Sequence, residues 1–376
     1  MTKNIMPKVR MRTTRDLREF NEKNVLRILR SEGVMTKSQI ARALDISFST
    51  VSQICDKLEE EGLVRRTTGV LSSGGRPPAS FSLNPYSRIS LCIDLTGSSS
   101  VNVALVGLDG SIILRKMLPF LPGEGVQEIL LDVLRLYPVL LQEVSISTDQ
   151  VLGVGVAIPG IYDLHRKCVV NSTLPFLEGS PLKDIVAQMF DLPVLVENES
   201  NLAALASSMD GGRQKYQELL FLYMGIGLGL GIVHNGSIFR GARGFAGEIA
   251  HIPLGDPDYV CYCGNRACIE GLLSGIGGSR ILESMREDYG RKKIGQAAGI
   301  LVATLVNLFD PEIVFIGADW NFPLPDVLPH MRQEIKQRVI LQQARNVRIN
   351  VLSGDVHELF IRGASEIVIQ HWLTYP

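Results

Sequence analysis

The chain has 376 residues, of which 45% are hydrophobic and 20% are charged. These values predict a folded protein of two or three domains and exclude a largely disordered one. No uninterrupted run of about 18 apolar residues occurs, so neither a membrane-spanning helix nor a membrane partner is expected. The basic N-terminal segment has no apolar stretch behind it, which argues against a secretory signal and predicts a cytoplasmic protein.

The net charge of −1 is divided unevenly along the chain. Residues 1–90 contain 16 Lys and Arg against 9 Asp and Glu, a net charge of +7. The remaining residues contain 22 against 30, a net charge of −8. A basic N-terminal part suits a polyanionic partner, although such an asymmetry can also arise by chance.

The N-terminal part carries the pattern of three short helices. Thr36 and Gln39 form a capping box that starts the second helix. After a tight turn, Ser47 or Ser49 caps the third helix. The inner stripe of this helix has the spacing i, i+3, i+4 and i+7 and consists of Val51, Ile54, Cys55 and Leu58.

Two short helices joined by a tight turn predict a helix-turn-helix, and two strands over 63–67 and 79–83 predict a wing. Arg76 lies at the slim tip of this wing, from which a side chain can enter a minor groove. The alternative is a winged helix used only for protein contacts, but the charge of +7 favours DNA. The outer face of the third helix, which would contact DNA, carries Ser49, Thr50, Ser52, Gln53 and Lys57.

The rest of the chain alternates between β-rich and helical segments, which predicts an α/β fold with mixed sheets. The expected strands cover 91–94, 101–106, 111–114, 151–158, 194–196, 219–224 and 229–233, and the expected helices cover 125–141, 182–190, 202–209 and 294–309.

Three of the six cysteines lie within eight residues of one another. In a cytosolic chain such a cluster favours a metal site over disulfides. Cys261, Cys263 and Cys268, together with the upstream His251, form a Cys3His set that suits a structural, tetrahedral Zn²⁺ site. The alternative is a group of buried free thiols.

Two motifs are the most specific in the chain. Residues 244–251 read Gly-Phe-Ala-Gly-Glu-Ile-Ala-His, and residues 261–270 read Cys-Tyr-Cys-Gly-Asn-Arg-Ala-Cys-Ile-Glu. They resemble the patterns GxAGExGH and CxCGxxGCxE of the ROK family of repressors and kinases, with Ala250 and Ala267 in place of two glycines. Together with the winged helix, the resemblance covers essentially the whole chain and is to the regulator branch, including repressors of the xylose type.

This resemblance implies an actin-like ATPase fold with two α/β lobes behind the winged helix-turn-helix. We expect the winged-helix domain over 1–85, and the first lobe over 86–200. The C-terminal helix, over about 358–376, is expected to rejoin the first lobe. The second lobe is expected over 201–357 and to carry the zinc motif and the oligomerisation surface.

The resemblance also implies a sugar pocket. In similar kinases the sugar hydroxyls are bound by side chains that match Asn198, Glu248, His251 and Glu270. Asn171 resembles a further sugar-contacting residue. His251 can serve both zinc and sugar, because its ring has two nitrogens.

The kinase machinery looks altered. Glu199 stands where the family has an aspartate as catalytic base, and its longer side chain displaces the carboxylate. Asp94-Leu-Thr96-Gly97-Ser replaces the phosphate turn Asp-x-Gly-Gly-Thr, and the β-branched Thr96 would crowd a phosphate. We therefore predict no kinase activity and a degenerate nucleotide site, in which the retained glycines include Gly225, Gly227 and Gly317.

The sequence thus predicts a sugar-responsive transcriptional repressor of sugar uptake or catabolic genes. As a homodimer or homotetramer, it would bind a pseudo-palindromic DNA operator. The alternative is a bifunctional, ATP-dependent sugar kinase with a DNA-binding head. Regulation by a protein partner in place of a sugar stays open as well.

Overall fold

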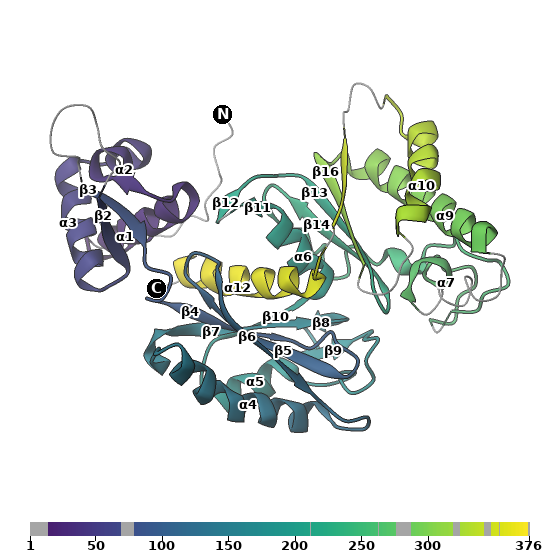
Figure 1. Cartoon of the computed structure of the whole chain (residues 1–376), viewed down its shortest axis with the longest axis horizontal. Coiled ribbons are helices and arrows are strands. Elements are labelled where there is room, and N and C mark those ends of the chain that lie inside the picture. Colours follow the sequence, from purple (N-terminus) through teal and green to yellow (C-terminus); the bar gives the residue numbers. More distant parts are fainter. Residues whose placement is uncertain are drawn as a thin grey trace.

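Figure 1 presents a computed structural model in which a small N-terminal domain lies beside two α/β lobes. The structure describes residues 14–68, 79–210, 212–261, 263–275, 287–318, 324–341, 347–352 and 354–374. Within these ranges, no helix combines the length and the apolar character that crossing a bilayer requires.

The N-terminal domain packs three helices against a small antiparallel sheet with the strand order β1-β3-β2. The predicted inner stripe of the third helix is buried, as amphipathic spacing requires. The second strand of the predicted hairpin starts at Ala79 as expected. The elements are α1 (Thr14–Glu32), β1 (Met35–Thr36), α2 (Lys37–Leu44), α3 (Phe48–Glu60), β2 (Val64–Thr68) and β3 (Ala79–Leu83).

Side-chain caps set the turn between α2 and α3. The capping box of Thr36 and Gln39 is present at the start of α2, as the sequence predicts. Asp45 ends this helix in the left-handed conformation, with φ of 54°. Ser47, one of the two predicted caps, accepts a hydrogen bond from the backbone N–H of Thr50 and starts α3.

The first lobe is a five-stranded sheet with the order β10-β7-β4-β5-β6, buried on both faces. Alternate residues of one strand show this, because Leu91 and Ile93 pack toward α4 and α5 whereas Cys92 packs toward α6 and α12. The elements are β4 (Ile89–Asp94), β5 (Ser100–Gly107), β6 (Ile112–Pro119), α4 (Val126–Glu143), β7 (Val151–Ile158), α5 (Leu182–Phe190) and β10 (Val194–Asn198).

The second lobe repeats this arrangement with the strand order β15-β14-β13-β16-β17. Leu220 and Leu222 of its central strand pack toward α9 and α10, and Phe221 between them packs toward α6 and α12. The elements are β13 (Leu219–Met224), β14 (Leu228–His234), β15 (Ser237–Ile238), α7 (Glu270–Leu273), α9 (Glu287–Phe309), β16 (Ile313–Ala318), α10 (Leu324–Arg338) and β17 (Arg348–Val351).

Helices α6 (Glu199–Ser207) and α12 (Val356–Thr374) lie between the two sheets (Figure 1). They touch through their backbones, because a Cβ atom on Gly363 of α12 would lie 2.2 Å from the carbonyl oxygen of Leu202. A Cβ atom on Gly155 of β7 would likewise lie 2.3 Å from the carbonyl oxygen of Ala364. Helix α12 is therefore held closely between the sheet of the first lobe and α6.

The C-terminal end of α12 reaches the N-terminal domain (Figure 1). Ile369 and Leu373 are buried in the same hydrophobic cluster as Val25 and Leu29 of α1. The side chain of Lys23 donates a hydrogen bond to the backbone carbonyl of Trp372. The N-terminal domain is therefore packed directly on α12.

Candidate functional site

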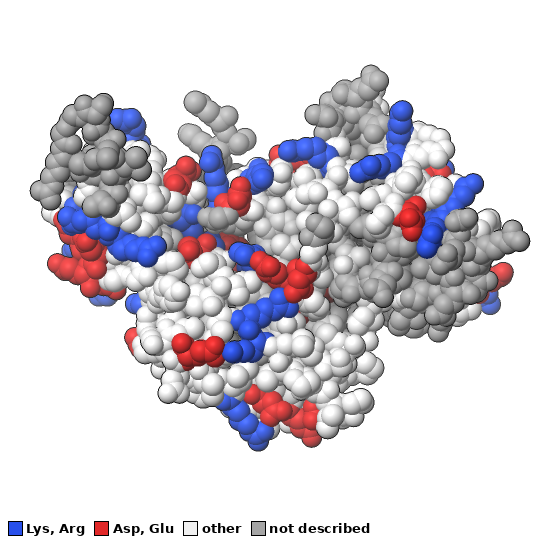
Figure 2. Space-filling view, in the orientation of Figure 1, with Lys and Arg blue, Asp and Glu red and all other residues white. Residues whose placement is uncertain are grey.

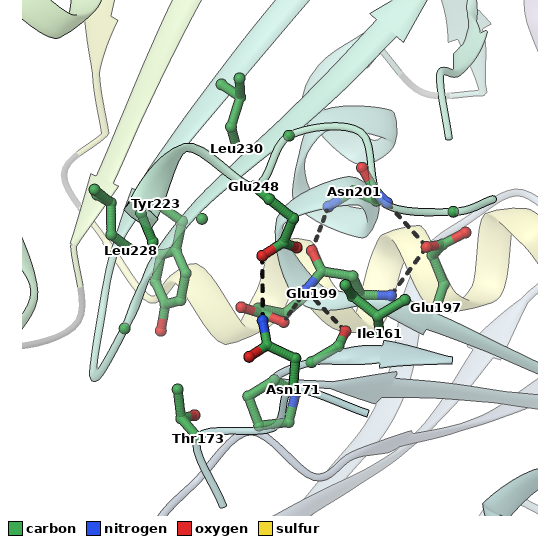
Figure 3. Close-up of a pocket in the computed structure, with 18 of the residues that line it drawn as sticks. Ile161, Asn171, Thr173, Glu197, Glu199, Asn201, Tyr223, Leu228, Leu230 and Glu248 are labelled. Carbon is green, nitrogen blue, oxygen red and sulfur yellow. Dashed lines mark hydrogen bonds between the residues drawn. The ribbon is translucent and has the colours of Figure 1, made fainter. Parts of the chain in front are cut away.

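A pocket lies between the two lobes (Figure 3). The first lobe contributes the end of β10 and the loop that contains Asn171. The second lobe contributes β14 and the segment from Gly244 to His251. The six residues for which the sequence predicts sugar contacts all line this pocket: Asn171, Asn198, Glu199, Glu248, His251 and Glu270.

Asn171 and Glu248 connect the lobes across the pocket. The side-chain amide of Asn171 donates a hydrogen bond of 3.2 Å to a carboxylate oxygen of Glu248 (Figure 3). Asn171 has a φ of 55°, in the left-handed region that asparagine tolerates better than most residues. A ligand in the pocket would meet polar groups from both lobes.

Asn198 positions the start of α6. Its Oδ1 accepts from the backbone N–H groups of Ser200 and Asn201, at 2.9 and 3.3 Å. Its Nδ2 donates to the carbonyl of Gly160 at 3.1 Å and to Glu199 at 2.7 Å. This cap explains why α6 begins at Glu199, three residues before the helix that the sequence predicts. Asn198 also orients the Glu199 carboxylate.

Two carboxyl groups, those of the solvent-accessible Glu248 and the buried Glu270, give the pocket its electrostatic character. Burial raises the pKa of Glu248, the negative charge of Glu270 raises it further, and the hydrogen bond from Asn171 lowers it. Burial likewise raises the pKa of Glu270, whereas a hydrogen bond from Cys261 lowers it. Both groups therefore keep their protons to a higher pH than an ordinary glutamate, and their oxygens can accept hydrogen bonds from hydroxyl groups.

The pocket also contains polar residues that the sequence did not single out. Arg240 donates to Glu197 at 2.6 Å, and Asn201 donates to the other carboxylate oxygen of Glu197 at 2.9 Å. The Oδ1 atom of Asn201 is buried and has no hydrogen-bond partner among the described residues. Glu197 and Asn201 flank the predicted Asn198-Glu199 pair, so proximity to that pair was the available signal. Arg240 lies far away in the sequence and gave none.

The predicted metal ligands come together beside this pocket. The ligand atoms of His251, Cys261, Cys263 and Cys268 all lie within 4.8 Å of one another. Nδ1 of His251 is 3.6 Å from Sγ of Cys261, and the Sγ atoms of Cys263 and Cys268 are 3.7 Å apart. Two sulfurs bound to one tetrahedral Zn²⁺ ion would lie about 3.8 Å apart, so both the ligand types and the spacing fit a metal ion.

The metal cluster and the pocket share residues. His251 belongs to both, and Sγ of Cys261 lies 3.6 Å from a carboxylate oxygen of Glu270. A bound ion would therefore fix one wall of the pocket.

The predicted phosphate turn is filled by the chain itself. Asp94 is fully buried, and one of its carboxylate oxygens accepts from the backbone N–H and the hydroxyl of Thr96, at 3.0 and 2.6 Å. The other oxygen accepts from Asn102 at 3.1 Å and lies 2.7 Å from Nδ1 of His357. The carboxylate thus has four partners, which leaves little capacity for a metal-bound phosphate.

The predicted glycines of the nucleotide site lie in separate turns and strands. Gly97 belongs to the turn after β4, where a Cβ atom would lie 2.3 Å from the carbonyl of Ser100. Gly225 donates to the carbonyl of Gly227 at 3.0 Å in the turn between β13 and β14. Gly317 lies in β16, opposite Tyr223 of β13. Thr96 and Gly227 also line the interlobe pocket.

The residues predicted to contact DNA differ in whether their side chains are free to do so or are hydrogen-bonded within the domain. Gln53 is exposed, but the hydroxyls of Ser49 and Thr50 lie 2.8 and 2.7 Å from that of Ser47, within the cap of α3. Ser52 accepts from Lys37 at 3.0 Å. Arg76 lies outside the described residues.

Lys57 is paired within the domain in this structure, and its contact with DNA stays a prediction. Its ammonium lies 2.7 Å from both carboxylate oxygens of Glu22 in α1 and 3.6 Å from Glu61. The residue lies on the side of α3 that turns toward α1, so its charge is neutralised within the domain. Figure 2 shows Lys and Arg side chains beside Asp and Glu side chains over the described part of this domain.

Residues 90–371 match the model of the ROK family, which is more than half of the chain. The chain belongs to the ROK family. Residues 21–65 match a second model, described as a winged helix-turn-helix that binds DNA. The family resemblance carried by residues 244–270 is thereby confirmed.

This ROK protein is similar over nearly its whole length to a xylose repressor of Caldicellulosiruptor bescii. The two are 30% identical over an alignment of 392 residues, gaps included, and the alignment covers 96% of this chain and 98% of the repressor. A xylose repressor of Bacillus subtilis is 25% identical, with 95% and 97% of the two chains covered.

The crystal structure of a ROK family transcriptional regulator, a homologue of the Escherichia coli MLC protein, confirms the predicted fold. It superimposes with a TM-score of 0.76 at 20% identity, and the match covers 95% of this chain and 98% of that one. The winged helix-turn-helix is therefore joined to a ROK sugar-kinase fold in both chains.

Proposed function

We propose that this ROK protein is a DNA-binding repressor that senses a sugar in its interlobe pocket and does not phosphorylate it. The observation that carries the proposal is the convergence of six polar residues in one pocket, on a chain that begins with a winged helix-turn-helix. The similarity to xylose repressors extends over both parts of the chain. Such a regulator acts in the cytoplasm, where the DNA is.

The pocket chemistry suits a neutral monosaccharide. Carboxyl groups at Glu199, Glu248 and Glu270 and the amide of Asn171 offer directed hydrogen bonds to several hydroxyls. A phosphorylated sugar would bring its negative charge close to these carboxyl groups. Because relatives that match nearly the whole chain are named xylose repressors, D-xylose and related pentoses are the first candidates.

Loss of kinase activity is supported by the surroundings of Asp94. Its carboxylate already has Thr96, Asn102 and His357 as partners. In an active kinase, the corresponding site must leave room for the phosphates and their metal ion. Glu199, which matches the position of the family base, is in turn held by Asn198.

A structural zinc ion at His251, Cys261, Cys263 and Cys268 forms part of the proposal. When bound, zinc would supply four coordinate bonds that hold two separated loops together. Glu248 precedes the ligand His251 and Glu270 follows the ligand Cys268, so these loops also place the two carboxyl groups in the pocket.

Ligand binding would act on DNA through the lobes. A sugar that bridges Asn171 and Glu248 stabilises one spacing of the lobes, and α12 lies between them and against the N-terminal domain. The sugar changes repression only if it binds better to one arrangement than to the other. In a homodimer or homotetramer, the two winged helices would face the half-sites of a pseudo-palindromic operator.

The test is a thermal-shift titration of the full chain with neutral pentoses and hexoses, their phosphates, and ATP. We expect one neutral sugar to raise the melting temperature, because it binds the folded state only. Glu248→Gln should weaken this shift about tenfold or more in ligand concentration, as expected when a hydrogen-bonding carboxylate of the site is lost. Glu143→Gln, on the exposed face of α4, is the matched control and should respond like the wild type.

Two results would contradict the proposal. If no sugar of this panel shifts the melting temperature, the pocket is not a site for a simple sugar. If the protein releases ADP from ATP in the presence of a sugar, it is a kinase, and the bifunctional alternative is correct.

A further inference from the structure

The first residue of α3, Phe48, is 56% exposed although it is a large apolar side chain. The local fold does not need it there. Ile46 and Val51, which flank the cap of α3, pack into the domain core and supply the apolar contact that commonly fixes a helix start. Burial within the N-terminal domain therefore does not explain Phe48.

The polar side chains around Phe48 are occupied within the protein. Ser49 and Thr50 bond to Ser47 in the cap. Ser52 bonds to Lys37 and Asp56. Of the residues predicted to read DNA from the described part of α3, only Gln53 is exposed without a hydrogen bond in the structure.

The position of Phe48 is the one from which a recognition helix contacts bases. In helix-turn-helix proteins, the N-terminal residues of the second helix reach base edges in the major groove, while the first helix crosses the backbone. Arg42, exposed in the last turn of α2, is suitably placed for a phosphate. The apolar feature that the major groove offers is the methyl group of thymine.

We propose that Phe48 determines operator specificity by packing its ring against a thymine methyl group, with Gln53 reading a second base and Arg42 binding a phosphate. The inference rests on DNA binding by the N-terminal domain as proposed above. It assigns sequence reading to the exposed start of α3, because two charged side chains further along the helix have partners within the protein. Asp56 pairs with Lys37, and Lys57 pairs with Glu22.

The experiment begins with in vitro selection of binding sites from a random DNA duplex library by the full-length wild type, Phe48→Ala and Arg42→Ala. We expect Phe48→Ala to lose the preference for thymine at one position of each half-site. Arg42→Ala should weaken binding to all sequences alike and lower the salt dependence, as loss of a phosphate contact does. Phe309→Ala, which removes an exposed phenylalanine at the end of α9 in the ROK body, should leave the selected sequence unchanged.

The second step removes the methyl group from the DNA instead of the ring from the protein. Replacing that thymine by deoxyuridine keeps every hydrogen bond of the base and deletes only the methyl group. Wild-type affinity should then fall about fourfold for each half-site, the value expected for exposing one buried methyl-sized group. Phe48→Ala should bind both duplexes equally.

The outcomes separate the two proposals. If the wild type selects a sequence but deoxyuridine at each of its thymines leaves the affinity unchanged, Phe48 does not read a methyl group and the inference is wrong. If the wild type selects no sequence at all, DNA recognition itself fails, and the inference fails with it.

Discussion

Arg30 of α1 and Glu366 of α12 form a buried ion pair that joins the DNA-binding domain to the ROK body. Two N–H groups of the guanidinium donate to the two carboxylate oxygens, at 2.9 and 2.5 Å. Only 7% of each side chain is exposed. The Nε–H of Arg30 also donates to the carbonyl of Leu108 at 3.0 Å. The orientation of the domain is thus set by directional contacts as well as by apolar packing.

Breaking this pair should destabilise the protein strongly. Glu366→Gln leaves the guanidinium of Arg30 buried without its hydrogen-bonded counter-charge, which costs about 3 kcal/mol or more of the free energy of unfolding. Chemical denaturation measures this loss. Arg15→Ala, which removes a pair with Glu19 on the surface, should leave the free energy of unfolding essentially unchanged.

Swapping the two charged residues tests whether the ion pair itself stabilises the protein. Arg30→Glu combined with Glu366→Arg should recover part of the stability that either single change loses. The same variants, measured for DNA release by the effector sugar, should release DNA less completely when the pair is broken. Full release by a protein that lacks the pair would show that the signal passes elsewhere.

Glu248 should make stability depend on pH in a defined direction. Its pKa is raised above the ordinary value of 4.5, so the folded state binds a proton that the unfolded state has already lost. The stability that this proton contributes is present below pH 4.5 and is lost as the pH rises through the raised pKa. Glu248→Gln should therefore flatten the decline in stability over this interval, measured by denaturation at several pH values. An unchanged slope would show that Glu248 titrates normally.

Zinc should copurify with the protein and depend on the cluster. Cys263→Ser removes one of four ligands, so we expect a lower zinc content by elemental analysis and a melting temperature lower by about 5 °C or more. Cys168→Ser, a cysteine outside the cluster, is the control and should keep its zinc. A wild-type protein that is fully folded and free of zinc would refute the metal site.

The blocked phosphate turn predicts how kinase activity could be restored. The wild type should release no ADP in the presence of sugars, whereas Thr96→Gly with Glu199→Asp should show a small activity. Adding His357→Ala removes one of the two partners of an Asp94 oxygen, the other being Asn102, and should raise the activity further. Asp94→Asn in this background should abolish it. If His357→Ala has no effect, the histidine is not what closes the site.

Sequence patterns predicted the features of this protein that depend on residues close together in the chain. The capping box of Thr36 and Gln39, the buried stripe of α3 and the positions of the predicted strands along the chain are local or periodic features. The family motifs located the six pocket residues, which the structure brings together although they are spread over about a hundred positions of the chain.

Features that depend on contacts between distant segments could not be predicted. Lys57 has the spacing of an outward-facing residue, but whether it meets DNA or Glu22 depends on how α1 crosses α3. The altered nucleotide site was predicted from Thr96 and Glu199, whereas the partner of Asp94, His357, comes from a helix more than 250 residues further along the chain. Arg240 was missed for the same reason.

The shared core of α1 and α12 also constrains the order in which the protein can become functional. Domains generally fold as they emerge during synthesis, with the N-terminal one first. Here Ile369 and Leu373 complete the core of the N-terminal domain, and the ribosome makes them only after both lobes. A nascent chain therefore cannot present a finished DNA-binding domain before its sensor exists, so each molecule that reaches an operator already carries the means to be released from it.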